Sequence, residues 1–363
     1  MVREIKNIQD FKNKRVLVRV DFNVAIDEKG DVKERFKIEA AKEMVMYLKK
    51  AGAQIALLSH LGRPEECSCQ KDSKRTHEPR KCPKLSTCRI SDDVERIFRT
   101  PIQFVPACVG KRVEEALSNN KEEKIILLEN IRFEKKEAEN NMDFAKELAK
   151  PFDAYINEAF SVCHRQHSSV VAIAQVLPSF AGIRLKKEID VLTKVKENPE
   201  KPAVAIIGGA KIHTKLPMIK MFEKKYDIVL VGGKIANEAV DEKITFAKNV
   251  LLPNDFADEK RRDIGKKTIK NFCTEISRAK TIVWNGPMGM IEKKPFEEGT
   301  YAIAKEINKT KAFEVVGGGE SLQVLEEMNI LDNLDFVSTG GGAMLAFLSG
   351  EIMPGIQILT DKG

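Results

Sequence analysis

The sequence predicts an α/β protein of two doubly wound, Rossmann-like domains, each built on a parallel sheet. Its 363 residues exceed what one hydrophobic core usually organises. Its short apolar runs do not alternate with polar residues, which indicates strands buried on both faces of a parallel sheet. Between these runs, apolar residues recur three and four positions apart, as in amphipathic helices. Strands alternating with helices define the α/β class.

Nine segments are expected to form strands, and we take them in chain order. They are RVLVRV (15–20), QIALL (54–58), KIILL (124–128), DAYI (153–156), AVAII (203–207), DIVLV (227–231), TIVW (281–284), FEVV (313–316) and DFVS (335–338). The clearest helix is IEAAKEMVMYLKKAG (38–52), which has helical spacing of its apolar residues and ends in glycine.

The joint between the domains is expected near residues 184–201, where a polar helix leads into a proline-marked loop and a new strand. This helix would act as a hinge, with a ligand cleft between the domains. The predicted boundaries are 1–184 for the first domain, 185–348 for the second and 349–363 for a tail. Residues 65–90 fit neither strand nor helix and are interpreted as an insertion in the first domain.

Composition and charge exclude several classes of protein. A hydrophobic content of 42% describes a globular chain. The net charge of +7, from 61 basic and 54 acidic residues, fits an anionic ligand or simply a lysine-rich surface. No stretch reaches the roughly 20 apolar residues of a membrane helix, and the first residues lack the apolar core of a signal peptide. We therefore expect a cytoplasmic protein with no membrane partner.

Glycine-rich loops follow five expected strands of the second half: IIGGAK (206–211), LVGGK (230–234), VWNGPMG (283–289), VVGGGES (315–321) and STGGGA (338–343). Glycine lets backbone N–H groups approach an oxyanion, and the following helix N-terminus favours negative charge. Five such loops predict a phosphate or nucleotide site, although a single glycine pair is usually only a turn. Neither a P-loop nor a complete dinucleotide fingerprint is present.

The first half offers a different set of side chains, again after apolar strands. The segments are VDFNV (20–24), SHLGRP (59–64), LLENIRF (127–133) and NEAFSVCHRQHSS (157–169). Their arginines suit carboxylates and phosphates. Singly each would more often be a surface ion pair, but together they predict a basic anion pocket. One glycine-rich and one arginine-rich half imply two ligands that meet across a cleft.

In this order and approximate spacing, these segments resemble phosphoglycerate kinase over nearly the whole chain. The resemblance implies reversible, magnesium-dependent transfer of a phosphoryl group between 1,3-bisphosphoglycerate and ADP, giving 3-phosphoglycerate and ATP, in glycolysis or its reverse. It also implies two domains around a hinged cleft, with the tail returning to the first domain, and small-molecule substrates. We expect a monomer.

The resemblance assigns roles by motif. The 3-phosphoglycerate pocket would comprise Asp21, Asn23, His60, Arg63, Arg132 and Arg165, with His164 and His167 in support. Lys211 would contact the transferring phosphoryl group, which the amides of Gly340, Gly341 and Gly342 would face. The nucleotide would meet Gly208, Gly209, Lys215, Gly232, Gly233, Asn285, Pro287, Gly318, Gly319 and Ser321, with Glu292 on the ribose.

Three features depart from the family pattern. Lys37 stands where the family usually has an arginine, so the charge is kept but the bidentate fork is lost; Arg35 is a possible substitute. Glu320 stands where the usual aspartate is linked to magnesium. The stretch from Asn237 to Asp263 is shorter than usual, as in some archaeal members.

The insertion carries Cys67, Cys69, Cys82 and Cys88, with His77 between them. Thiolates and imidazole are zinc ligands, but the usual C-x2-C pairs are absent. Structural zinc, reduced thiols and disulfides therefore all remain open.

Two other functions compete with an active kinase. One is a catalytically weakened homologue that binds nucleotide, motivated by Lys37 and Glu320. The other is a nucleic-acid-binding protein that uses the basic insertion. Because the insertion has no aromatic residue to stack on bases, nucleic acid is the weaker alternative.

Overall fold

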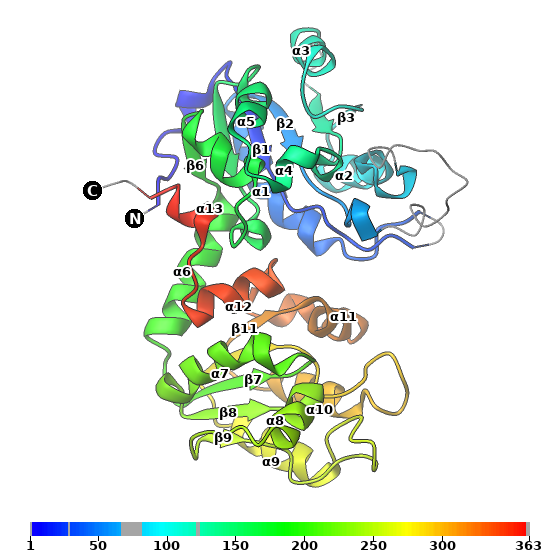
Figure 1. The fold of residues 1–363 in the computed structure, drawn as a ribbon, viewed down its shortest axis with the longest axis vertical. Helices are drawn as coiled ribbons and strands as arrows, with labels where there is room; N and C mark the ends of the chain where they lie inside the picture. The colour runs from blue at the N-terminus through cyan, green and yellow to red at the C-terminus, as the bar shows by residue number, and fades with distance from the viewer. Residues whose placement is uncertain (1, 28–29, 67–81, 121–123, 361–363) are drawn as a thin grey trace. The chain divides into compact units, whose positions relative to one another are not determined.

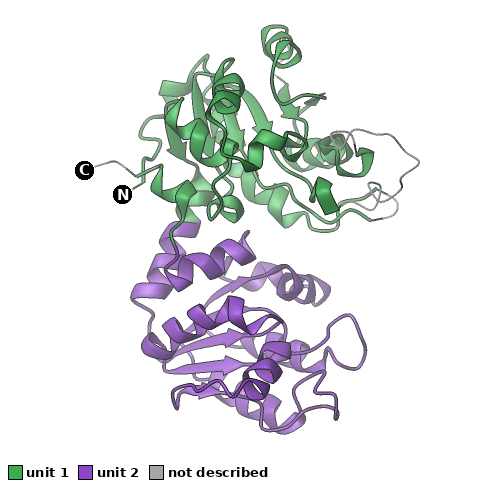
Figure 2. Cartoon of the chain, in the orientation of Figure 1, with its two compact units in different colours: residues 1–187, 352–363 green, residues 188–351 purple. Residues whose placement is uncertain are grey.

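The computed structural model describes residues 2–27, 30–66, 82–120 and 124–360. The chain divides into two compact units, coloured separately in Figure 2. Unit 1 comprises Met1–Lys187 and Ile352–Gly363, and unit 2 comprises Glu188–Glu351. Each unit contains one six-stranded sheet whose strand pairs are all parallel (Figure 1).

The sheet of unit 1 has the strand order β3-β4-β2-β1-β5-β6. The strands are β1 (Arg15–Arg19), β2 (Gln54–Leu58), β3 (Ile102–Val105), β4 (Ile125–Leu128), β5 (Ala154–Asn157) and β6 (Ser179–Ala181). Val16 and Val18 of β1 pack into one hydrophobic cluster, while Leu17 between them packs into a second cluster. Because successive side chains point to opposite faces of a strand, the two clusters cover the two faces of the sheet.

The helices of unit 1 cover these faces and connect the strands. They are α1 (Phe36–Lys50), α2 (Ser91–Phe98), α3 (Lys111–Ser118), α4 (Lys135–Ala138), α5 (Met142–Ala149) and α13 (Pro354–Gln357). The last helix comes from the end of the chain, where the amide of Arg3 donates to the carbonyl of Leu359 at 2.7 Å and the amide of Gly355 donates to that of Cys163 at 2.9 Å. The two ends of the chain therefore complete the same unit.

Helix α6 (Ile183–Glu197) spans the boundary between the units. In unit 1 the buried carboxylate of Glu158 accepts the amide of Arg184 at 2.8 Å and so caps the first turn of α6. In unit 2 the buried carboxylate of Glu188 accepts the amide and hydroxyl of Thr339, at 2.7 and 2.9 Å. Two buried carboxylates thus fix this helix to its neighbours in each unit.

The sheet of unit 2 has the order β12-β11-β10-β7-β8-β9. Its strands are β7 (Ala203–Ile207), β8 (Ile228–Val231), β9 (Val250–Leu251), β10 (Thr281–Asn285), β11 (Phe313–Gly317) and β12 (Phe336–Val337). Its helices are α7 (Ile212–Lys225), α8 (Gly233–Asp241), α9 (Lys266–Ile276), α10 (Glu298–Ile307), α11 (Gly319–Glu327) and α12 (Gly341–Ser349). Trp284 at the centre of this sheet is fully buried.

All nine predicted strands are present with ends within one residue of the expected ones, and α1 lies two residues before the predicted helix. The fold class is therefore confirmed. Strands β3, β6 and β9 were missed. β6 and β9 have only three and two residues, and β3 (IQFV) contains a polar residue, so none reads as a clear apolar run. Within the described ranges no helix has the length and apolar character needed to span a membrane.

Candidate functional site

Unit 1 places the predicted anion-binding residues at the carboxyl ends of four neighbouring strands. β4 leads to Arg132, β2 to His60 and Arg63, β1 to Asp21 and Asn23, and β5 to Arg165. In a parallel sheet the carboxyl ends of all strands meet at one edge, which is where ligands of α/β proteins bind. The topology therefore gathers residues that are up to 144 positions apart, from Asp21 to Arg165, at one edge.

The peptide groups of Gly62 join three of these elements. The side chain of Asn23 accepts the amide of Gly62 at 2.8 Å, and Arg132 donates through Nη1 to the carbonyl of Gly62 at 2.7 Å. Lys37, at the start of α1, donates to the carbonyl of Asn23 at 2.8 Å and lies 3.3 Å from the carboxylate of Glu34. Lys37 is therefore in direct contact with Asn23, a residue of the predicted pocket.

A cavity of about 560 Å³ lies against the arginines of unit 1. Its lining residues are Arg63, Pro64, Glu65, Arg132, Phe133, Glu134, Lys135, Glu137, Ala138, Glu139, Arg165 and His167. Three of the predicted residues, the arginines, line it; among the described residues, Asp21, Asn23 and His60 do not, and Asn23 connects to it through Gly62.

Glu65, Glu134, Glu137 and Glu139 also line the cavity, but the charges that act most strongly on Arg132 are positive. Burial, with the nearby positive charges of Arg19, Arg165 and Arg63, lowers the pKa of Arg132 to about 10. Arg63 is half-exposed and bonded at 2.7 Å to Glu66. Because the guanidinium groups repel one another, a bound anion would relieve that repulsion, and this electrostatic arrangement favours a phosphate or carboxylate ligand.

The histidines of unit 1 differ in their surroundings. His60 is buried, and burial together with the positive charges of Arg19 and Arg132 holds its pKa well below the usual range. Burial lowers the pKa of His164 to about 4, and its Nδ1 has no partner among the residues that the structure describes. His167 lines the cavity, with Nδ1 3.5 Å from the carboxylate of Glu137. His60 and His164 are therefore expected to be largely uncharged near neutral pH.

Unit 2 repeats the arrangement with glycine loops. The predicted loops follow β7, β8, β10, β11 and β12, which are five consecutive strands of the sheet, and four of these loops run directly into the N-termini of α7, α8, α11 and α12. Exposed N–H groups and helix dipoles therefore accumulate at one edge, where they favour anionic oxygen atoms.

Two of the loops need glycine because the backbones touch. The amide of Gly209 donates to the carbonyl of Pro287 at 2.7 Å. A Cβ atom on Gly208 would lie 2.1 Å from that same carbonyl oxygen. Gly209, Gly233 and Gly318 also have φ values of +86°, +63° and +103°, a region that L-residues with side chains rarely adopt. These glycines shape the edge of the sheet.

Gly319 and Gly342 behave differently. A Cβ atom at either position would meet nothing within 4 Å. Both lie in the first turn of a helix, α11 and α12 respectively. Because the surrounding protein does not require glycine there, the free space at these helix N-termini is consistent with close approach of a ligand to the backbone.

The two lysines of GGAKIHTK adopt contrasting positions. Lys215 is buried, and its ammonium donates to the carbonyl of Gly208 at 2.5 Å and to the side chain of Asn285 at 3.0 Å. Burial lowers the pKa of Lys215 to about 8, with the charge of Glu320 acting in the opposite direction. Lys211 is exposed, has φ = +66° and forms the N-cap of α7. One lysine is therefore fixed beneath the loops, while the other can reach a ligand.

Residues of the loop after β10 support this arrangement. Asn285 is buried, and its Nδ2 has no partner within the described chain, so it keeps a donor available at the centre of the edge. The hydroxyl of Ser321 accepts the amide of Gly286 at 2.9 Å and is itself buried. Ser321 thus anchors the loop after β10 through this hydrogen bond to Gly286.

A cavity of about 450 Å³ in unit 2 joins several of the predicted residues. It is lined by Gly209, Ala210, Gly233, Lys234, Asn237, Glu238, Asp241, Lys260, Arg261, Arg262, Pro287, Gly289, Met290, Glu292 and Glu320. Of the predicted nucleotide-site residues, this set includes Gly209, Gly233, Pro287, Glu292 and Glu320. The cavity follows the glycine loops, as expected for an extended ligand that carries phosphate at one end.

The basic side of this cavity was not predicted from the sequence. Lys260, Arg261 and Arg262 come from the stretch between α8 and α9, and Arg261 forms two hydrogen bonds with Asp241, at 2.9 and 2.7 Å. Arg262 lies 3.8 Å above the ring of Phe296. The run of three basic residues was the available signal, but without a strand immediately before it the run resembled an ordinary solvated loop.

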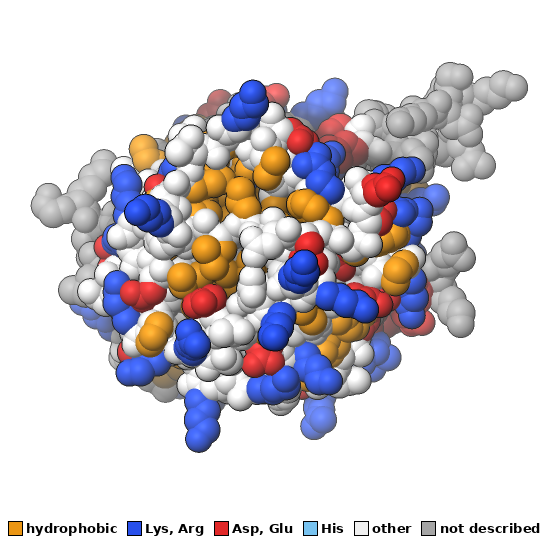
Figure 3. Space-filling view, turned by 90° about the horizontal axis from the view of Figure 1, so that it is seen from below, with side chains coloured by type: hydrophobic (Ala, Val, Ile, Leu, Met, Phe, Trp, Pro, Cys, Tyr) orange, Lys and Arg blue, Asp and Glu red, His pale blue; other side chains and the backbone are white. Residues whose placement is uncertain are grey.

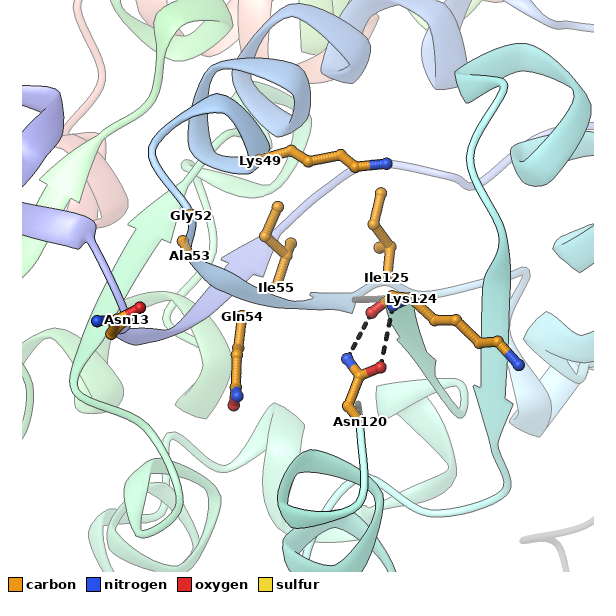
Figure 4. A pocket seen from close by; sticks show the side chains of 9 residues that line it. All are labelled: Asn13, Lys49, Gly52, Ala53, Gln54, Ile55, Asn120, Lys124 and Ile125. Atoms are coloured by element: carbon orange, nitrogen blue, oxygen red, sulfur yellow. Dashed lines mark hydrogen bonds between the residues drawn. The ribbon is translucent and has the colours of Figure 1, made fainter. Parts of the chain in front are cut away.

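A third cavity, of about 370 Å³, lies at the amino ends of strands β2 and β4 in unit 1 (Figure 4). Lys49 reaches across it and donates to the hydroxyl of Thr100 at 3.2 Å. The side chain of Asn120 closes on the backbone of Lys124, at 2.6 and 2.9 Å. Since these polar groups bond to the protein itself, we assign this cavity no role.

A zinc site finds no support in the described residues, among which no three His, Cys, Asp or Glu side chains gather to hold a metal. Of the four cysteines of the insertion, Cys82 is buried and Cys88 is exposed, while Cys67 and Cys69 lie outside the described residues. The remaining metal candidate is Glu320, whose single carboxylate fits a magnesium ion that takes most of its ligands from phosphate and water.

Comparison with known proteins identifies close relatives of the whole chain. The sequence model of the phosphoglycerate kinase family matches residues 5–244 and 239–351. Phosphoglycerate kinase of Dictyoglomus turgidum is 38% identical, over 98% of this chain and 97% of the relative, and that of Leptospira biflexa is 37% identical over the same shares. Among solved structures, phosphoglycerate kinase from Coxiella burnetii (29% identity, TM-score 0.77) covers all of both chains. That from Pyrococcus horikoshii OT3 (26% identity, TM-score 0.82) covers 96% of both.

Proposed function

The chain belongs to the phosphoglycerate kinase family, and we propose that unit 1 binds the three-carbon acid while unit 2 binds the nucleotide. The enzyme is a phosphotransferase that reversibly moves a phosphoryl group from 1,3-bisphosphoglycerate to ADP, giving 3-phosphoglycerate and ATP, in glycolysis or its reverse. The reaction depends on magnesium. Membership of the family establishes the reaction, whereas the roles of individual residues are our proposal.

The electrostatics of unit 1 support the assignment of the acid. Arg63, Arg132 and Arg165 line one cavity, and the pKa of Arg132 is lowered by burial and by its positively charged neighbours. 3-Phosphoglycerate carries a phosphate and a carboxylate, which guanidinium groups bind with charge-assisted hydrogen bonds. The convergence of Arg63, Arg132 and Arg165 on one cavity is the single observation that carries this part of the proposal.

The loops of unit 2 support the assignment of the nucleotide. Their amides and the exposed ammonium of Lys211 would neutralise phosphate oxygens, and Glu292 lines the same cavity at a position suited to ribose hydroxyls. Glu320 would hold magnesium together with the nucleotide phosphates, and the ion would supply positive charge to the phosphate oxygens.

The chemistry asks little of the protein beyond position and charge. The oxygen that attacks is already an anion, of ADP in one direction and of the carboxylate in the other, so no general base is required. Lys211 and the amides of Gly341 and Gly342 would stabilise the charge on the transferring group. Exclusion of water by the bound substrates would protect the acyl phosphate from hydrolysis.

Chemical-shift mapping tests the division of labour directly. We expect 3-phosphoglycerate to shift the backbone amides of Gly62 and Arg132 in unit 1, and ADP with magnesium to shift those of Gly209 and Gly342 in unit 2. If 3-phosphoglycerate alone shifted only amides of unit 2, the assignment of the acid to unit 1 would be wrong.

The affinity for ADP is expected to fall as pH rises above about 8. The pKa of Lys215 is lowered to about 8 from its usual 10.5, so its ammonium loses the proton as pH rises through that value. Because protonated Lys215 holds the glycine loop through Gly208 and Asn285 and adds positive charge beneath the phosphates, the dissociation constant should rise by up to about tenfold per pH unit above this point. Calorimetric titrations from about pH 7 to about pH 9.5 would measure it.

Lys215→Arg is the matched variant, because arginine keeps its proton throughout this range. Its ADP affinity should change little between the two ends of the pH series, even if arginine fits the buried position less well. If the affinity of the wild type for ADP stayed constant up to about pH 9.5, protonation of Lys215 would not control ADP binding.

Lys37→Arg is expected to raise the rate, by up to about tenfold, because it restores the bidentate fork that lysine lacks. Lys37 lies 2.8 Å from the carbonyl of Asn23 and 3.3 Å from Glu34, so an arginine at this position would have an acceptor and a carboxylate to orient it. Steady-state kcat would measure the effect. Lys50→Arg, at the far end of α1, is the matched control and should leave kcat unchanged.

The nucleic-acid alternative is assigned to the insertion at 65–90, of which residues 67–81 lie outside the described residues. On the face drawn in Figure 3, Lys and Arg side chains are interspersed with Asp and Glu and do not form one continuous basic patch. A catalytically weakened homologue is the other alternative. The positions of Lys37 and Glu320 are compatible with activity, so kinetic measurements decide between the two.

The insertion is expected to bind far less than one zinc ion per chain, because its spacing lacks the C-x2-C pairs of structural zinc sites. Inductively coupled plasma mass spectrometry of the purified protein would measure the content. Stoichiometric zinc that disappears in Cys82→Ser and Cys88→Ser would instead establish the structural zinc site.

We keep two further expectations as proposals, a monomer and a cytoplasmic location. Large apolar side chains that are exposed in the described chain are few and far apart in sequence, namely Val176, Val240, Met290 and Ile352, which supports a monomer. Sedimentation velocity would detect a dimer.

A further inference from the structure

Arg19 is a buried cation that the reaction described above does not use. It lies in β1, is 1% exposed and has partners for each part of its guanidinium. Nη1 donates to the carbonyl of Val20 at 2.5 Å, Nε donates to the hydroxyl of Ser169 at 3.1 Å, and Nη2 lies 3.2 Å from Nδ1 of His60. Arg19 therefore joins strand β1 to a histidine of the predicted substrate pocket.

The contact with His60 is a hydrogen bond in only one sense; the carboxylate of Asp21, 4.0 Å from the same Nδ1, lies beyond hydrogen-bond distance. A guanidinium group has donors and no acceptor, so Nδ1 of His60 must accept with its lone pair. The proton of an uncharged imidazole then sits on Nε2. A doubly protonated ring would oppose two donors and two positive charges at 3.2 Å in a buried place.

We propose that Arg19 is a positioning residue that fixes the proton of His60 on Nε2, and that Glu137, acting through Ser169, holds Arg19 in place. The proposal rests on the assignment of the three-carbon acid to unit 1. His60 is 3% exposed and lies outside the lining of the unit 1 cavity; its single N–H donor is then on Nε2, while Nδ1 accepts from Arg19.

Glu137 gives the chain of hydrogen bonds its direction. Its carboxylate is 1% exposed and accepts both the hydroxyl of Ser169 at 2.6 Å and the amide of Ser169 at 2.8 Å. Because the hydroxyl proton of Ser169 points to Glu137, its oxygen presents lone pairs to Nε of Arg19. The order Glu137, Ser169, Arg19, His60 therefore has a fixed donor and acceptor at every step.

The same carboxylate also connects to the cavity of unit 1. Glu137 lines it, and His167 approaches Glu137 to 3.5 Å. The hydroxyl of Tyr155 donates to the carbonyl of Ser169 at 2.7 Å and fixes the backbone from the opposite side. A network with this many fixed bonds is a rigid support, of the kind that orients groups which touch a ligand.

The first test reads the proton on His60 without measuring activity. The chain has five histidines, so long-range proton–nitrogen correlation spectra are simple, and His60→Gln assigns the signal. We expect the wild type to show a protonated Nε2 and an unprotonated Nδ1 from about pH 6 to about pH 8. A proton on Nδ1, or an even mixture of the two tautomers, would overturn the proposal.

The second test uses Arg19→Met, which removes the donors, and Arg19→Lys, which keeps the positive charge on a single donor nitrogen. Arg19→Met should mix the tautomers of His60 and lower kcat/KM for 3-phosphoglycerate about tenfold or more, with KM for ATP within about twofold. Arg19→Lys should recover part of both effects. Arg15→Met, four residues earlier in the same strand, is the matched control and should change neither.

If Arg19→Met does not fold, the tautomer of His60 and kcat/KM can be measured in Ser169→Ala instead. This variant removes the hydrogen bond from Nε of Arg19 to the hydroxyl of Ser169 and keeps the buried charge of Arg19. Lower kcat/KM in the variants with the tautomer of His60 unchanged would show that Arg19 acts only through its charge, and the proposal would fall. A wild type with the expected tautomer but no turnover would instead contradict the assigned reaction, so the two failures are distinguishable.

Discussion

Lys211→Ala is expected to lower kcat by about 10²- to 10³-fold while leaving the binding of ADP nearly intact. Lys211 is exposed at the N-cap of α7 in a left-handed backbone conformation, next to the loop of Gly208 and Gly209. An exposed ammonium at this loop is well placed to neutralise a transferring phosphoryl group, and we expect it to contribute little to the ground-state complex. Steady-state ATP formation, with kcat and KM separated, measures the effect.

Two further variants make this result specific. Lys224→Ala removes a lysine from the last turn of the same helix and should leave kcat unchanged. Lys211→Arg keeps the charge and should retain much of the rate. If Lys211→Ala raised KM for ADP as strongly as it lowered kcat/KM, Lys211 would be a nucleotide-binding residue, contrary to the role assigned to it.

Arg132→Met is expected to raise KM for 3-phosphoglycerate by roughly 10²-fold, with KM for ATP unchanged. Arg132 lines the cavity of unit 1, is bonded to the carbonyl of Gly62 and is surrounded by Arg19, Arg63 and Arg165. Its removal takes away charge-assisted hydrogen bonds to the anion. Initial rates in the direction of ATP consumption would give both constants.

Arg132→Met should also change the thermal stability of the ligand-free protein, which the kinetic constants do not report. Because Arg132 is repelled by its neighbours and partly buried, the variant should unfold at an equal or higher temperature than the wild type. Arg112→Met, an exposed position on α3, is the matched control and should affect neither constant. An unchanged KM for 3-phosphoglycerate in Arg132→Met would remove Arg132 from the pocket.

The sequence predicted the loops of both units because each follows a strand buried on both faces. Asp21 follows β1, Gly208 follows β7 and Asn285 ends β10, and in a parallel sheet these carboxyl ends share one edge. The local sequence pattern and the geometry of a parallel sheet are therefore enough to predict where these loops lie. Strands β6 and β9 were missed; each lies at the edge of its sheet, where it pairs with β5 and β8 respectively.

Arg19 and Glu137 were missed for a different reason. Arg19 meets His60 across 41 positions and Ser169 across 150 positions of the chain, so its role depends wholly on how strands β1, β2 and β5 pair. A charged residue inside the apolar run RVLVRV was the available signal, since a cation is buried only where partners satisfy it. Its partners belong to segments that no local pattern connects.

The most direct test of the account is steady-state formation of ATP from 1,3-bisphosphoglycerate and ADP with magnesium by the wild-type protein, measured beside Lys211→Ala and Lys37→Arg. We predict robust wild-type turnover that collapses in Lys211→Ala and rises modestly in Lys37→Arg. A near-silent wild type that Lys37→Arg revives would contradict the account, because it would mean that the lysine present in this chain cannot support the reaction of its family.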